Sequence, residues 1–378
     1  MKKRGKDLTN AQQDDLRLLL KARFEAADKA MGKTMASVRD LQYAALLGQF
    51  DSALIQLGDI GSSLYLNGVM NTAKALATGN KRAKITADDL GLVNQVSAEL
   101  QNLNGMTKFL DFALTYSGFR KIDKLGKDTF LKAAWRKNTK LARANPDAIA
   151  KKYGDVFENE TADLIADLQA GRVTDNTKLL MWNELADVQP IALSEMPQLY
   201  LEMTNGRILY SLKSFGLKQL NLIRQNIVKR GQRGDVTGAF EEALKYSLLI
   251  GMANGTVENA RKFLLSGFDT DAIRDIDDVT YESLAKIFFL SKYSRDKYLS
   301  KGQYGTFVTE LLTPAAPSIL DTLGAAMNNV LLEQENNEEA FNKAMKVIPV
   351  AGKSYYYLIG GGAEKVIEQV EKEEREEK

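Results

Sequence analysis

The sequence predicts an all-α fold: a multi-helix assembly with a central buried helix near residues 205–230 and little or no β structure. Only six of the 378 residues are proline, which leaves long stretches free to be helical. Apolar residues recur at helical spacing through much of the chain, whereas the alternation typical of strands never extends beyond a few residues. An apolar fraction of 44% is ample for a core.

The stretch 205–230 carries the most regular helical pattern. At 100° per residue its apolar residues fall on one face: Leu209, Leu212, Gly216, Leu220, Ile223 and Ile227. The absence of a side chain at Gly216 lets another backbone approach this face closely. Lys213 and Arg224 lie at the edges of the face. The pattern therefore predicts a buried helix with basic edges.

The first 150 residues divide by composition into two regions. Residues 1–40 are predicted to form a basic N-terminal helical arm, and residues 41–150 a helical region rich in small residues. The small residues of 41–68 favour close helix–helix packing, although their low polarity also suits a helix that meets lipid. Asp51 and Asp59 oppose stable residence in a membrane.

A basic segment, 119–143, stands out within the second region. Residues 120–143 hold nine Lys or Arg against two Asp or Glu, and Phe130 and Trp135 lie among them. Cations interleaved with aromatic residues can bind nucleic acid through phosphate contacts and base stacking. The same composition also fits an ordinary basic helix on a protein surface. Asn145-Pro146 is predicted to end this helix, because the residue before proline resists helical geometry. Including the edges of the 205–230 helix, the candidate contacts to nucleic acid or a partner are Arg120, Lys121, Lys124, Lys132, Arg136, Lys137, Lys213 and Arg224.

Two further regions complete the chain. Residues 151–332 are predicted to form a helical core module in which the apolar helix 239–253 packs against the central one, and 170–172 turn the chain. Residues 333–378 form a polar, Tyr-rich segment with a charged tail. Three consecutive tyrosines, Tyr355, Tyr356 and Tyr357, cannot all be buried on one helical face. They are expected either at an interface with protein or lipid headgroups, or in a segment folded back onto the core.

The composition argues against an enzyme. The chain contains no Cys and no His, which removes disulfides, thiolate zinc sites and the usual general base. Glu184 and Glu195 flank a proline-containing turn and could serve as the acid and base of a muramidase, but no surrounding pattern supports that role. The glycine-rich stretch 231–238 lacks the GK[ST] ending of a phosphate-binding loop. We therefore assign no catalytic, cofactor-binding or metal-binding residue, and we expect no cofactor. No apolar run is long enough for a conventional transmembrane helix.

Three stretches together carry a family resemblance. SALIQLGDIGSSLYLNG within 47–68, NGRILYSLKSFGLKQLNLIRQ at 205–225 and the closing IPVAGKSYYYLIGGGAEK resemble large polyvalent-protein-associated domains of phage polyproteins and phage internal virion (ejection) proteins. The likeness covers most of residues 40–365 and includes no catalytic constellation. It implies a phage origin, an all-helical module, and packaging in the virion with ejection alongside DNA.

From these observations we expect a phage internal virion protein that is not an enzyme and that self-assembles as a homo-oligomer in the capsid core or in a DNA-translocating conduit across the host envelope. Its partners would be other virion proteins (portal, tail or ejection proteins), double-stranded DNA bound non-specifically, and the host membrane after ejection. The alternative is a cytoplasmic DNA-binding or anti-restriction accessory module of a phage polyprotein. A third class is an envelope-degrading enzyme that uses Glu184 and Glu195.

Overall fold

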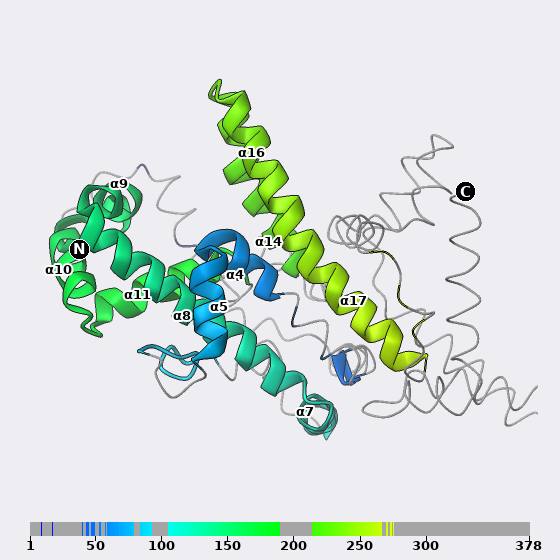
Figure 1. Ribbon diagram of the computed structural model, residues 1–378. Coiled ribbons are helices and arrows are strands. Elements are labelled where there is room, and N and C mark those ends of the chain that lie inside the picture. Colours follow the sequence, from blue (N-terminus) through cyan, green and yellow to red (C-terminus); the bar gives the residue numbers. More distant parts are fainter. Residues whose placement is uncertain are drawn as a thin grey trace, which may run out of the picture.

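The computed structural model describes residues 59–78, 84–92, 105–189 and 214–266, together with isolated residues between 9 and 57 and between 270 and 275. Helices make up most of these ranges, 84–92 being turns, and no β-strand occurs in them (Figure 1), which confirms the all-α fold. Lys213, Glu195, Tyr355, Tyr356 and Tyr357 lie outside the described residues, as does nearly all of 1–40 and all of 333–378.

Helix α8 (Phe119–Ala144) is the axis of the described bundle. Helices α4 (Asp59–Asn67), α5 (Val69–Ala77), α7 (Gly105–Tyr116), α9 (Pro146–Phe157), α10 (Thr161–Ala170) and α11 (Asp175–Ala186) all pack against it. Ten consecutive residues, 126–135, are buried, so neighbours enclose this part of the helix on every side. Its small residues, such as Gly126 and Ala134, let those neighbours approach closely.

Local signals in the sequence set the boundaries of the helices around α8. Asn145 ends α8, as predicted, and its side chain accepts a hydrogen bond from the Ala148 amide, while Pro146 occupies the first position of α9. A 3₁₀ turn, η4 (Glu158–Glu160), joins α9 to α10. Gly171 ends α10 in the left-handed conformation with φ 67°, which confirms the predicted turn at 170–172. Thr174 and Thr177 form a capping box at the start of α11.

The C-terminal described part is a helical hairpin that extends away from the bundle (Figure 1). Its first arm comprises α14 (Ser214–Ile223), the π-helical segment η6 (Arg224–Val228) and α15 (Lys229–Gln232). Its second arm comprises α16 (Val236–Tyr246), the π-helical segment η7 (Ser247–Gly251) and α17 (Met252–Leu265). The second arm packs on the first, as the apolar pattern of 239–253 predicted.

The hairpin is joined to the bundle through a close contact and a chain of hydrogen bonds. A Cβ at Gly61 of α4 would lie 3.0 Å from the Ala253 side chain, so α4 and the second arm approach closely there. This contact agrees with the predicted packing role of small residues in 41–68. The Tyr246 hydroxyl donates to Gln219 at 3.0 Å, and Gln219 donates to Ser62 of α4 at 3.2 Å.

The described part of the predicted 205–230 helix, from Ser214 onward, is less buried than the apolar pattern predicts. Among its residues whose side chains the structure describes, only Gln219 and Leu222 are buried, and Arg224 is exposed. The centre of the described bundle is instead occupied by α8, whose buried charged residues Lys127, Asp128 and Lys132 have partners within the fold.

Candidate nucleic-acid interface

The structure divides the basic residues of α8 into those with partners inside the fold and those facing solvent. Near its start, Arg120 pairs with Asp111 and Lys124 pairs with Asp88. Lys132 is buried and donates to the Ala75 carbonyl at 3.2 Å. These contacts place three of the predicted nucleic-acid residues in bonds that hold α8 to its neighbours.

The remaining predicted residues lie in different parts of the molecule. Lys137 donates to Glu184 at 2.6 Å, and its side chain is only 21% exposed. Lys121 is exposed near the start of α8 and Arg224 is exposed on η6, whereas Arg136 lies toward the other end of α8. The structure therefore does not gather the predicted set into one surface.

A group of cations that includes one predicted residue, Arg136, does come together, in an open groove between α5 and the C-terminal half of α8. The groove has a volume of about 530 Å³. It is lined by Asn71, Lys74, Trp135, Arg136, Thr139, Lys140, Arg143 and Ala144. Four of these eight residues are cationic and none is acidic, so the groove is a concentrated positive surface.

Helical geometry explains how the groove forms. Arg136, Lys140 and Arg143 are spaced i, i+4 and i+7, which places them on one face of α8. Lys74, in the last turn of α5, lies across from them because α5 packs along α8. Trp135 is buried and forms part of the lining, and Phe130 is buried too. The base stacking that the sequence suggested for these two aromatics is therefore not available in this structure.

In the part of the chain that the structure describes, no acidic side chain neutralises the groove cations. Within the described residues none of the four forms an ion pair. The Arg136 guanidinium donates to the Thr78 hydroxyl at 3.4 Å, and that of Arg143 donates to the Gln169 carbonyl at 2.9 Å. These neutral partners orient the two guanidinium groups without neutralising them. Lys74 and Lys140 are exposed. The sequence signal for this site was the i, i+4, i+7 spacing, but the contribution of Lys74 depends on tertiary packing.

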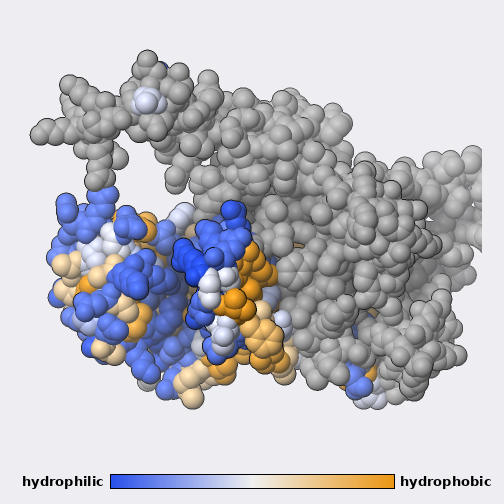
Figure 2. Space-filling model, turned by 90° about the horizontal axis from the view of Figure 1, so that it is seen from above, coloured by the Kyte–Doolittle hydropathy of each residue, from blue (hydrophilic) through white to orange (hydrophobic). Residues whose placement is uncertain are grey.

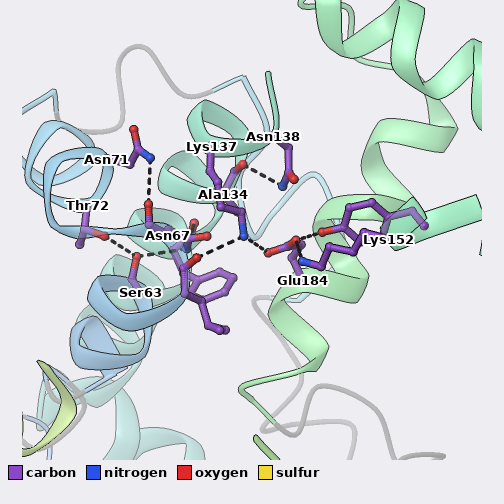
Figure 3. A network of polar contacts seen from close by, with 12 residues as sticks. Ser63, Asn67, Asn71, Thr72, Ala134, Lys137, Asn138, Lys152 and Glu184 are labelled. Carbon is purple, nitrogen blue, oxygen red and sulfur yellow. Dashed lines mark hydrogen bonds and ion pairs between the residues drawn. The ribbon is translucent and has the colours of Figure 1, made fainter. Parts of the chain in front are cut away.

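A second polar feature, a buried network around Glu184, connects α11 with α8 and α9 (Figure 3). The Glu184 side chain is 4% exposed and accepts from Lys137 at 2.6 Å, from Lys152 at 3.0 Å and from the Tyr153 hydroxyl. Lys137 also donates to the Leu66 carbonyl of α4 at 3.4 Å. Beyond it, Figure 3 shows hydrogen bonds between α4 and α5, from Ser63 to Thr72 and from Asn71 to the Asn67 carbonyl, and one within α4 from Asn67 to Ser63.

The charges of this network are unfavourable for the acid role considered for Glu184. Burial alone raises the pKa of Glu184, but the ammonium groups of Lys137 and Lys152 outweigh it and hold that pKa below its ordinary value. The acid of a glycosidase needs a raised pKa so that it holds a proton at neutral pH. Glu184 is instead an ionised group that joins three helices.

The described residues include no group of acidic side chains arranged to hold a metal ion. None of the described helices combines the length and apolar character needed to cross a membrane. The chain matches no protein-family model, and no curated protein or solved structure is significantly similar to it.

Proposed function

We propose that this chain is a non-enzymatic, self-assembling internal virion (ejection) protein of a phage, and that the groove between α5 and α8 binds the phosphate backbone of double-stranded DNA. The observation that carries the DNA part is the groove itself, with four cations, no carboxylate and no ion pair among the described residues. The phage setting is supported by the family resemblance of the sequence.

The groove suits phosphates better than bases. Arg136 and Arg143 are seven residues apart, so they lie about 10 Å apart along the helix axis. A stretch of B-DNA of about 10 Å carries about six phosphate charges, enough to engage all four cations. No aromatic face is presented in the groove, because Trp135 is buried. Binding is therefore expected to be independent of sequence and sensitive to salt.

Binding to a fluorescent 30-base-pair duplex tests the DNA part. The variant K74Q/K140Q removes two exposed groove cations whose ammonium groups form no hydrogen bond among the described residues. The control K151Q/K229Q removes two exposed lysines from α9 and α15. We expect the groove variant to bind at least tenfold more weakly at low salt, and the control to bind like wild type. Equal weakening by both variants would contradict a localised site.

Quantitative mass spectrometry of purified particles tests the virion part. Many copies before triggered genome release and loss afterwards are expected of an ejected protein. Retention after release would make the chain a fixed component of the capsid or tail. Absence from particles would favour the second candidate, a cytoplasmic DNA-binding or anti-restriction module, which the same groove supports.

The remaining partners are predictions of the same proposal. In an ejected protein, portal, tail or other ejection proteins would be neighbours in the particle, and Tyr355, Tyr356 and Tyr357 would meet protein or the host membrane after ejection. Cross-linking of intact particles followed by mass spectrometry would identify those neighbours.

A further inference from the structure

The second arm of the hairpin exposes a stripe of large hydrophobic residues. Five of them occur at intervals of four residues and have exposed fractions between 46% and 70%: Val236, Phe240, Leu244, Leu248 and Met252. The opposite side of the same arm packs on the first arm and on α4. The arm therefore has two apolar sides, and only one of them is covered by other described helices.

The spacing makes the stripe a continuous ridge. Residues four apart form one of the ridges by which packed helices interdigitate. Such a ridge drifts slowly around an α-helix. The π-helical segment η7, whose hydrogen bonds span one residue more, limits this drift between Leu244 and Met252. In Figure 2, which looks down on the molecule from the side to which the hairpin extends, hydrophobic residues gather in a band beside strongly hydrophilic ones.

The exposed area is large enough for a specific contact. With these exposed fractions the five side chains present on the order of 500 Å², which is as large as the largest apolar patch on a typical monomer. Two such stripes in contact would bury about 1,000 Å², near the lower limit of specific protein interfaces.

We infer that the stripe is covered by the same stripe of a second copy of this chain, with the two arms antiparallel and Leu244 at the crossing point. In this register Phe240 faces Leu248 of the other copy, and Val236 faces Met252. Glu241 and Lys245 flank Leu244 on one side of the stripe, and both are exposed. A twofold axis through the crossing keeps this flank on the same side in both copies. Glu241 of each copy then approaches Lys245 of the other, whereas a twofold axis along parallel arms would place this flank of the two copies on opposite sides of the contact and keep these charges apart.

The inference names the surface through which the proposed self-assembly takes place, and it rests on the self-assembly part of the proposed function alone. DNA binding by the groove does not depend on it, because the groove lies on α5 and α8. The two ideas can therefore fail separately.

Single-cysteine variants test the register, because the chain has no cysteine of its own. Packed helix axes about 8–10 Å apart bring facing Cα atoms within the range of a disulfide. Under mild oxidation L244C should cross-link to itself. F240C and L248C should each form little homodimer but should cross-link to each other when mixed. L179C, on a leucine of α11 that is 44% exposed, is the control and should stay uncross-linked.

Sedimentation velocity of the full chain tests the energetics. L244E should raise the dissociation constant of the dimer at least tenfold. E241K should raise it by a smaller factor, because the introduced ammonium group would face Lys245 of the other copy. L179E should leave it unchanged. Circular dichroism of each variant shows whether it is folded.

The outcomes of these experiments distinguish the proposed stripe contact from self-assembly through another surface and from lipid binding. An oligomer that resists L244E and fails to cross-link through L244C would overturn this inference and leave self-assembly standing. A monomer at all concentrations would overturn both. A monomer that binds phosphatidylglycerol vesicles, and loses that binding in L244E, would overturn the inference in favour of a lipid surface.

Discussion

Replacing Glu184 by Gln should destabilise the fold strongly while changing almost no volume. The carboxylate is 4% exposed and is the common partner of Lys137, Lys152 and Tyr153. Lys152 is 53% exposed and can turn toward water. Lys137 is 21% exposed and would keep its charge inside the protein without a counter-charge.

The size of the effect depends on Lys137, whose charge would be left without a counter-charge. Removing one partner of a buried ion pair costs about 3–5 kcal/mol, because the other charge stays desolvated. The double variant K137M/E184M removes both charges and restores apolar packing, so it should recover most of the loss. E160Q, which changes an exposed glutamate of η4, is the matched control and should unfold like wild type.

The assay is urea denaturation at a series of pH values. Glu184 and Lys137 predict opposite changes of the unfolding free energy with pH. The folded pKa of Glu184 is depressed, so its contribution is present above the unfolded carboxyl pKa and is lost as pH falls through the folded pKa. The difference in unfolding free energy between wild type and E184Q should therefore become smaller at acidic pH. Burial lowers the pKa of Lys137 and Glu184 opposes that effect, so the pKa should fall further in E184Q. Because the unfolded state then binds more protons, E184Q should regain stability as pH rises.

An E184Q protein within about 0.5 kcal/mol of wild type, the range of ordinary surface substitutions, would refute this reasoning. So would a K137M/E184M protein no more stable than E184Q, because the loss would then come from packing and not from charge.

Three further predictions rest on other parts of the described structure. With four phosphate contacts per groove, the logarithm of the DNA-binding constant should fall with the logarithm of the salt concentration with a slope of about −3.6. K74Q/K140Q should reduce the magnitude of this slope by about 1.8 in anisotropy titrations. Gly61→Leu should cost about 1–3 kcal/mol in chemical unfolding because its Cβ meets Ala253 at 3.0 Å, whereas Gly154→Leu, with open space around it, should cost nothing. Thr174→Ala should cost about 1 kcal/mol in the same assay, because it removes the cap of α11.

The sequence predicts well the helix ends and turns, because residues adjacent in the chain determine them. Asn145-Pro146 ends one helix and starts the next, because proline fixes φ and the Asn145 side chain caps the new helix. Gly171 turns the chain because it adopts the left-handed conformation without steric cost. The helical period of the apolar residues correctly indicates the all-α class.

What the sequence does not predict is which helix is central. Hydropathy counts every Lys of α8 as a surface residue, so its pattern indicates an ordinary basic surface helix. Its burial depends on partners far along the chain: Asp128 accepts from the Ala87 amide, Lys132 donates to the Ala75 carbonyl, and Lys137 pairs with Glu184. Those partners lie 41 to 57 residues away, so no local pattern reveals them.

The groove and the stripe together make a prediction that neither makes alone. A twofold dimer through Leu244 carries two grooves, and once one groove holds a duplex, the other meets the same DNA at an effective concentration that can reach the millimolar range. If the geometry lets both grooves engage, wild-type protein should bind long DNA more tightly than L244E does and with a salt slope up to twice as steep, although Leu244 lies outside the groove. On a duplex too short for two grooves the difference should vanish. Anisotropy titrations on both lengths measure this, and an equal loss of affinity on both would show that L244E damages the groove itself.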